Sequence, residues 1–419
     1  MRNLSKVTAL AILMSVSGAA ITAPVLAAPD YAKIEARKKA KTKIMGERTG
    51  KKVIKAFDLY NEDKIDEAIA LLKEIDASND FDKATVNRYL GSMYAQKEKY
   101  AEAIKYSRQA VAPDILNFAD HEQTLKLLGD LYAGTEKFKE AKKAYTAWMD
   151  FTGEEDPKVY TRIAQANYQL GQFRDVFEPA DKAISLQKEP NKAPYQLKLG
   201  SYFELKDYPN MVKIGEEIVR VWPDDKKAWV SLGKYYLQTE DYAKGLATME
   251  VAFKNGYFEA EVDYKVLSNF YSLNEIPFKA AKTLENAIKE DKVKRTKQNV
   301  NAIASNYHRS KDIEKAAKYY EEAAKFDDDA ELYRKAGSLL LQSENFSAAV
   351  VRLNKALELG SDKKGTVYSD LAEAYYYQAK YKQAYAAITK AMDDPRTRKF
   401  AKGWASFIKD KAARNGVKI

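Results

Sequence analysis

Residues 229–252 read WVSLGKYYLQTEDYAKGLATMEVA. The stretch opens with the pattern W-x₂-L-G-x₂-Y, whose apolar residues fall on one face of a helix. Gly245 follows twelve residues after Gly233. Two antiparallel helices approach closely only where small side chains meet. The stretch therefore predicts a helical hairpin whose two helices are closest at these two glycines.

The small residue at Gly233 marks a position that recurs along the chain, and we call it the anchor. Ten anchors follow one another at intervals of 33–38 residues: Ala56, Gly91, Gly129, Ala164, Gly200, Gly233, Ser268, Ala304, Gly337 and Ala372. A single hairpin cannot bury both of its faces, so such units are stable only when they stack on neighbours. The repetition predicts ten stacked hairpins.

A second small residue supports the same repeat independently. Alanine stands twelve residues after the anchor in seven copies: Ala68, Ala103, Ala141, Ala280, Ala316, Ala349 and Ala384. Gly245 is an acceptable substitute, and Val176 departs from the pattern. In the fifth copy Met211 comes one residue early, which predicts a shortened turn between the helices of that hairpin.

These positions resemble those of the tetratricopeptide-repeat (TPR) family over residues 53–395. The resemblance implies an all-α, right-handed α-solenoid superhelix of about ten helix-turn-helix units. Residues 396–419 carry an amphipathic helix with Phe400, Trp404, Phe407 and Ile408, which is suited to cap the last repeat. Residues 30–49 predict a basic helix with a thin apolar side.

The N-terminus has the features of a secretory signal peptide. Arg2 and Lys6 precede an apolar run over residues 7–16, and Val25-Leu26-Ala27 supplies a cleavage site after residue 27. The alternative is an uncleaved membrane anchor. The sequence has no Cys, which excludes disulfides, thiolate metal sites and lipidation of the mature N-terminus. We therefore expect a soluble protein exported to the periplasm, with no further membrane span.

The net charge of +10 is concentrated near the N-terminus. Residues 28–52 contain nine Lys or Arg against three acids, so the remaining 367 residues of the mature chain are nearly neutral. This basic lead-in, with Arg37, Lys38, Lys39, Lys41 and Lys43, is either a solvated cap or a contact site for an acidic partner or an anionic membrane surface. A nearly neutral main domain disfavours nucleic-acid binding.

Residue patterns of catalysis are absent from the sequence. The two histidines, His121 and His308, lie far apart, and no zinc-protease, CxxC or phosphate-loop motif occurs. Acidic runs at residues 154–156 and 327–329 fall between repeats, where they serve as solvated linkers and helix caps. We expect no enzyme activity, no cofactor and no metal.

In the TPR family, ligands usually lie along the concave face formed by the first helix of each repeat. We select candidate partner-binding residues at positions three before and one after an anchor, and add His308 and Tyr376 as two further groove positions. The ten candidates are Arg88, Lys126, Gln165, Lys234, Lys265, Asn269, Asn301, His308, Arg334 and Tyr376. Lys265 with Asn269 resembles half of the carboxylate clamp that some TPR proteins use, and Asn301 and Arg334 extend it. The alternative is an ordinary polar surface.

The overall layout resembles the periplasmic TPR proteins that accompany TonB–ExbB–ExbD energy-transduction systems. It combines a signal peptide, the basic lead-in and about ten degenerate repeats. The resemblance implies a scaffold or adaptor that binds other proteins, including TonB-complex components, and assists outer-membrane uptake of iron complexes. The alternative is a scaffold for envelope assembly or polysaccharide export.

Overall fold

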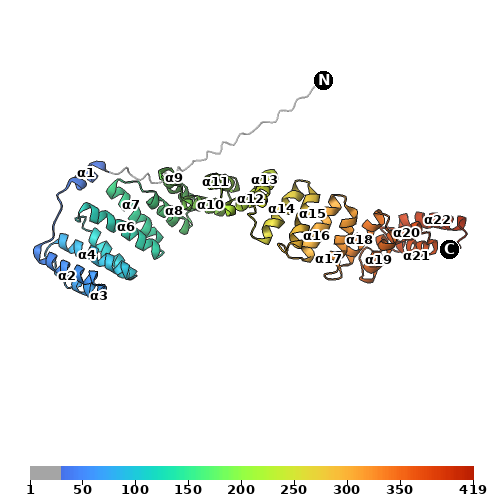
Figure 1. Ribbon diagram of the computed structural model, residues 1–419, viewed down its shortest axis with the longest axis horizontal. Helices are drawn as coiled ribbons and strands as arrows, with labels where there is room; N and C mark the ends of the chain where they lie inside the picture. Colours follow the sequence, from blue (N-terminus) through green and yellow to red (C-terminus); the bar gives the residue numbers. More distant parts are fainter. Residues whose placement is uncertain (1–29) are drawn as a thin grey trace, which may run out of the picture. The chain divides into compact units, whose positions relative to one another are not determined.

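A computed structural model describes residues 30–419, and the predicted signal peptide lies outside this range. The described residues form 22 α-helices and one short 3₁₀ helix, without strands. The prediction of an all-α solenoid is confirmed. The helices divide into two compact units, whose described parts are residues 30–189 (unit 1) and 190–419 (unit 2). In each unit, successive helices follow one another in chain order (Figure 1).

Unit 1 contains one leading helix and four hairpins. Its elements are α1 (Tyr31–Lys39), α2 (Glu47–Asn61), α3 (Ile65–Lys73), α4 (Asp80–Gln96), α5 (Tyr100–Val111), α6 (Phe118–Gly134), α7 (Phe138–Thr152), α8 (Pro157–Gln169), η1 (Phe173–Val176) and α9 (Phe177–Leu186). The hairpins pair α2 with α3, α4 with α5, α6 with α7, and α8 with α9.

Unit 2 contains six hairpins and one closing helix. Its elements are α10 (Lys192–Glu204), α11 (Tyr208–Val221), α12 (Lys226–Gln238), α13 (Tyr242–Lys254), α14 (Glu261–Leu273), α15 (Pro277–Lys289), α16 (Lys297–Arg309), α17 (Ile313–Ala324), α18 (Ala330–Gln342), α19 (Phe346–Glu358), α20 (Lys364–Tyr377), α21 (Tyr381–Ala391) and α22 (Arg398–Arg414). The described residues therefore contain the ten predicted hairpins.

The turn inside every hairpin has the same conformation. Two residues before the second helix, or before η1 in the fourth hairpin, the backbone adopts a positive φ at Asp63, Glu98, Glu136, Gly171, Lys206, Glu240, Glu275, Lys311, Glu344 and Ala379. The next residue then donates its N–H to the carbonyl five residues earlier, as Asp241 does to Tyr236 at 3.2 Å. This left-handed cap with its six-to-one bond is a Schellman ending, which satisfies a carbonyl at the helix end.

Small anchors allow the two helices of a hairpin to touch. Nine of the ten predicted anchors are buried, and Gly200 is half-buried. A Cβ added at Gly337 would lie 2.7 Å from Cγ of Leu353, a side chain of α19 that has no solvent exposure. The same addition at Gly129 or Gly233 would overlap Tyr145 or Met249. The second helix therefore places a large side chain where the first has almost none.

The fifth hairpin differs from the prediction. Its turn has the common length, because Lys206 has the positive φ and Asp207 donates to the Tyr202 carbonyl at 2.8 Å. The expected shortened turn is wrong. The equivalent of the anchor is therefore Leu199, one residue before Gly200. Gly215 lies sixteen residues later, and both line one hollow of about 170 Å³. A Cβ added at Gly215 would lie 3.1 Å from Leu232 and 3.2 Å from Tyr235, both on α12 of the next hairpin.

Three tyrosines connect consecutive hairpins of unit 2 in one repeated arrangement. The hydroxyl of Tyr236 donates to Glu216 at 2.6 Å, Tyr271 donates to Glu250 at 2.5 Å, and Tyr307 donates to Glu285. A lysine of the following helix lies over each ring. Burial opposes ionisation of Glu285, but hydrogen bonds from Lys289 and two tyrosines lower its pKa to about 2. These bonds fix the register between neighbouring hairpins.

The two ends of the described chain are covered differently. At the C-terminus α22 buries Ala401, Ala405, Ile408 and Ala412 against the last hairpin. At the N-terminus the expected single helix over residues 30–49 is wrong. The backbone becomes extended at Ala40 and α2 begins at Glu47, so the basic lead-in is a short helix followed by an extended link.

Candidate protein-binding surface

The first helices of consecutive hairpins contact one another, as α4 does with α6 and α18 with α20. Their solvent-facing sides form a surface that we call the first-helix face; each unit has its own. All ten candidate residues lie on these helices and are exposed or half-buried. Side chains on this surface reach solvent, and several of them also pair with acids of the next hairpin.

In unit 1 the candidate cations are neutralised within the chain. Arg88 on α4 pairs with Asp120 at 2.8 Å, and Lys126 on α6 pairs with Asp156 at 2.6 Å. Gln165 on α8 is exposed and accepts a hydrogen bond of 3.3 Å from Arg162. Gln165 also lines a hollow of about 290 Å³ together with Asp130 of α6. Polar groups of two first helices therefore meet at this hollow.

In unit 2 the candidate cations are also paired. Lys234 lies 2.7 Å from Asp263 of the next hairpin, Lys265 lies 3.2 Å from Glu261, and Arg334 lies 3.0 Å from Glu331. The two basic residues of the predicted carboxylate clamp thus have acidic partners already.

The uncharged candidates of unit 2 lie on three first helices. Asn269 on α14 and His308 on α16 are exposed. Asn301 on α16 is half-buried, and its Oδ1 is covered without a hydrogen-bond donor in the described chain. This amide oxygen therefore lacks the hydrogen bond that a covered polar atom normally has.

Two carboxylates that the sequence interpretation did not select lie on α20. Burial raises the pKa of Asp370, although it accepts a hydrogen bond from the Ser338 hydroxyl. Burial and the charge of Asp370 raise the pKa of Glu373. Neither carboxylate forms an ion pair with any residue between 30 and 419. Glu373 directly follows the anchor Ala372, so the rule that selected Lys234 also points to it.

Aromatic side chains adjoin these carboxylates. The ring of Tyr376 on α20 lies 5.8 Å from Trp404 and 5.2 Å from Phe407, both on α22. Tyr377 is 56% exposed, Phe400 53% and Phe407 50%. Edge and tilted contacts of this kind hold the rings in place while leaving part of each accessible. Tyr376 is therefore part of a half-exposed aromatic cluster.

The basic lead-in is bound to unit 1. Arg37 pairs with Asp114 and lies 4.5 Å from the centre of the Phe151 ring. The N–H of Lys43 donates to Asn117 Oδ1 at 2.8 Å, and its ammonium donates to the Ile115 carbonyl at 3.1 Å.

Other cations of the lead-in differ in their contacts. Lys38 lies 5.4 Å from the centre of the Phe118 ring. Lys39 and Lys41 are exposed, and Lys39 makes only a 3.7 Å contact with Glu35. Arg37, Lys38 and Lys43 are thus engaged inside the unit, and the other two face solvent.

A buried histidine lies beneath the lead-in. His121 on α6 stacks on Phe151 with ring centres 4.3 Å apart, and its Nδ1 is 3.8 Å from Asp114. Burial lowers the pKa of His121; Asp114 opposes this effect and the Arg37 charge adds to it. The imidazole is therefore neutral at pH 7 and serves as packing beneath α1.

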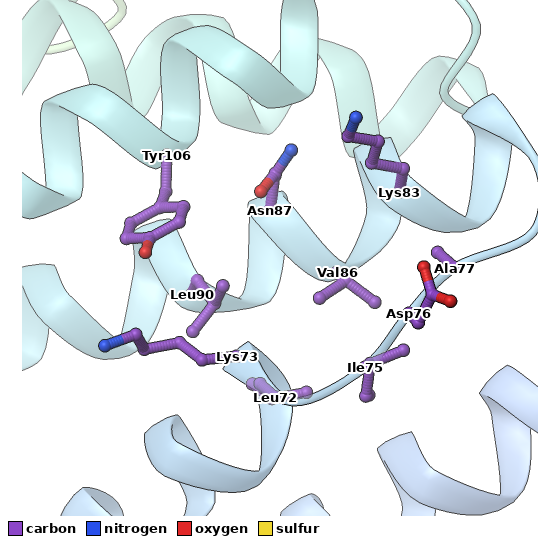
Figure 2. A pocket seen from close by; sticks show the side chains of 10 residues that line it. All are labelled: Leu72, Lys73, Ile75, Asp76, Ala77, Lys83, Val86, Asn87, Leu90 and Tyr106. Atoms are coloured by element: carbon purple, nitrogen blue, oxygen red, sulfur yellow. The ribbon is translucent and has the colours of Figure 1, made fainter.

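A hollow of about 240 Å³ lies between the first two hairpins of unit 1 (Figure 2). Its apolar floor is Leu72, Val86 and Leu90, which are buried core residues. Lys83 and Asn87 of α4, Tyr106 of α5 and the linker from α3 to α4 surround it. The lining combines core side chains with solvated lysines and an aspartate, which is typical of a crevice between stacked repeats.

Two further properties concern the described residues alone. No helix between residues 30 and 419 combines the length and apolarity that crossing a membrane requires. In the same range, no three His, Cys, Asp or Glu side chains lie close enough together to hold a metal ion.

Comparison with known proteins supports the tetratricopeptide-repeat family. The family model described as "Tetratricopeptide repeat" matches residues 90–112 and 299–329, which fall in the second and eighth hairpins. None of the curated proteins compared with the chain matches it.

Similar solved structures include several repeat proteins. A tetratricopeptide repeat protein from Parabacteroides merdae ATCC 43184 is 14% identical, with 70% of this chain and 98% of that one covered and a TM-score of 0.36. YrrB, described as a TPR protein with an unusual peptide-binding site, is 14% identical, with 46% and 97% covered and a TM-score of 0.36. The Naa15/Naa10 complex bound to HypK-THB is 13% identical, with 86% and 66% covered and a TM-score of 0.41.

Proposed function

We propose that this chain is a scaffold that binds other proteins on its first-helix faces. The observation that carries the proposal is the exposure of large apolar side chains on first helices of both units. Ile54 on α2 is 62% exposed, Phe203 on α10 58% and Leu273 on α14 41%. Each of these side chains offers apolar area that a bound partner would remove from water.

Crosslinking in cells tests this function. Full-length chain with a photoreactive residue beside Phe203 is expected to crosslink to discrete partner bands. Phe203→Ser and Ile54→Ser remove apolar contact area and are expected to weaken capture. The matched control is Val351→Ser, because Val351 is 60% exposed but lies on the second helix α19. Equal loss of capture in the control, or no loss in the first-helix variants, would refute the assignment of the surface.

We also propose that the chain acts in the periplasm. Support comes from the signal-peptide pattern of residues 1–27, and the sequence offers no Cys for lipidation at the cleavage point. N-terminal sequencing of protein from the periplasmic fraction is expected to begin at Ala28. Recovery of the chain in the cytoplasm with residues 1–27 retained would overturn the proposal.

A more specific role follows from the resemblance in layout. We propose that the scaffold assists a TonB-type system in outer-membrane uptake of iron complexes. Deletion of the gene is then expected to slow growth on an iron–siderophore complex while leaving growth on free iron salts unchanged. Wild-type growth under iron limitation, combined with altered outer-membrane composition or secreted polymer, would instead favour envelope assembly or polysaccharide export.

A further inference from the structure

We propose that residues 31–46 of the basic lead-in, which we call the latch, are docked on unit 1 while His121 is neutral and are released when His121 takes up a proton. Release frees Arg37, Lys38 and Lys43 from their contacts with the unit. The proposal goes beyond the scaffold function and does not depend on it. It is carried by one carboxylate, that of Asp114, which faces both the latch and the histidine.

A small set of contacts holds the latch on unit 1. Arg37 donates a hydrogen bond to Asp114 and lies over the Phe151 ring of α7. Ile34 is the one buried residue of α1. Lys43 is bonded through its backbone and its ammonium to the linker between α5 and α6. Arg37 lies between these two attachments in the chain, so loss of its ion pair weakens the middle of the latch.

Asp114 lies between the latch and the histidine. Its Oδ2 accepts the hydrogen bond from Arg37, and its Oδ1 lies 3.8 Å from Nδ1 of His121. Both Arg37 and His121 also contact the Phe151 ring. Nδ1 of His121 is buried without a hydrogen-bond partner in the described part of the chain. A protonated imidazole donates from both nitrogens, so its N–H at Nδ1 would compete with Arg37 for this carboxylate.

The docked latch opposes protonation of His121. Burial lowers the pKa of His121 and the Arg37 charge lowers it further, while Asp114 acts in the opposite direction. Release of the latch reduces the burial, removes the Arg37 charge and leaves Asp114 to His121 alone. Each of these changes raises the proton affinity of the ring. Because the released state binds the proton more tightly, a fall in pH shifts the equilibrium toward release.

Other charged groups surround the histidine. On α6, Asp120 is paired with Arg88 at 2.8 Å. Burial and the charge of Glu154 raise the pKa of Glu122, which follows His121 directly. The ring that α7 contributes is uncharged, and Lys38 of α1 lies over the Phe118 ring. Lys38 leaves together with Arg37, so its departure also favours protonation in the released state.

Fluorescence anisotropy of the full chain measures release of the latch. The sequence has no Cys, so a single introduced thiol carries the only label. Lys39→Cys places the label at the end of α1, and Lys139→Cys places it on α7 as a control for unit 1 itself; both positions are exposed. Anisotropy at position 39 is expected to fall on acidification, because the ratio of released to docked latch rises by up to about tenfold per pH unit below about 6.5. Anisotropy at position 139 is expected to stay constant.

Variants in the Lys39→Cys background assign the effect to one side chain. His121→Phe keeps an aromatic ring on Phe151 but cannot take up a proton, so its anisotropy is expected not to change with pH. The matched control is His308→Phe, which alters the other histidine, an exposed residue of unit 2, and is expected to respond like the parent. Asp114→Asn removes the charge that Arg37 contacts and is expected to release the latch already at neutral pH. Circular dichroism confirms that each variant is folded.

Hydrogen exchange provides a second measurement. After correction for its intrinsic pH dependence, amide exchange of residues 31–46 is expected to speed several-fold between about pH 7.5 and about pH 5.5 in the unlabelled wild-type chain and not in His121→Phe.

Three results would overturn the inference. Constant anisotropy at position 39 down to about pH 5 would show that no release occurs. A fall of the same size in His121→Phe would assign the response to other groups. An equal fall at position 139 would mean that unit 1 loosens as a whole and that the latch has no separate transition.

Discussion

Substitution of Gly337 tests whether small anchors determine how closely the helices of a hairpin approach. In Gly337→Ala the new Cβ lies 2.7 Å from Leu353 Cγ and 3.2 Å from the Leu353 backbone nitrogen. Leu353 has no solvent exposure, so it cannot move outward. Overpacking of this kind costs about 1–3 kcal/mol, partly offset by about 1 kcal/mol of helix propensity gained over glycine. We expect a net loss of up to about 2 kcal/mol of unfolding free energy.

The double variant makes the prediction specific. Leu353→Ala alone leaves a cavity and is expected to cost about 2–5 kcal/mol. In Gly337→Ala/Leu353→Ala the added methyl enters that cavity, so the double variant is expected to be at least about 1 kcal/mol more stable than the sum of the single losses predicts.

Urea unfolding followed by circular dichroism measures this coupling. Gly403→Ala is the control, because a Cβ at this exposed position of α22 meets no atom within 4 Å. It is expected to stabilise the chain by about 0.5–1 kcal/mol. Because stacked repeats unfold through neighbour interactions, the wild-type chain and the four variants are compared by transition midpoint and slope. Additive losses in the double variant, or a gain in stability from Gly337→Ala alone, would refute the reasoning.

Three other outcomes are expected. Burial lowers the pKa of His121 in the folded state, so the folded chain binds fewer protons than the unfolded chain. The free energy of unfolding should therefore fall as the pH drops below about 6.5. In His121→Phe the melting temperature should depend less on pH between about pH 7.5 and 5.5. Tyr271→Phe removes the hydrogen bond to Glu250 and should cost about 1–3 kcal/mol in urea unfolding, whereas an unchanged midpoint would mean that this bond contributes nothing. Arg37→Ala removes the pair with Asp114 and should speed amide hydrogen exchange of residues 31–46. Lys41→Ala, which alters an exposed side chain, is the control. Equal exchange rates in the two variants would contradict docking through Arg37.

The fifth hairpin shows where a local pattern misplaces a register. Gly200 is small and lies near the expected interval, so it was a natural anchor. The turn decides otherwise, because the bond from Asp207 reaches Tyr202 and not the next residue. The positive φ at Lys206 and this hydrogen bond, rather than the size of a residue, identify Leu199 as the equivalent of the anchor.

The candidate site shows a second limit. The cations at Arg88, Lys126 and Lys234 were predicted from their spacing relative to the anchor, and their positions on first helices follow from that spacing. Their acidic partners lie on neighbouring helices, 29–32 residues away in the chain. Which charges remain unpaired is therefore set by contacts between hairpins, and spacing within one hairpin does not contain that information.

The sequence by itself determined the ten hairpins, because the anchor, the small residue twelve positions later and the turn between them are local requirements for close helix packing. Only the tertiary structure decided that the lead-in lies on unit 1 through Arg37 and Lys43, and that acids of other hairpins neutralise Arg88, Lys126 and Lys234. Docking and ion pairing depend on side chains that meet across different hairpins, and their distances in space are set by stacking.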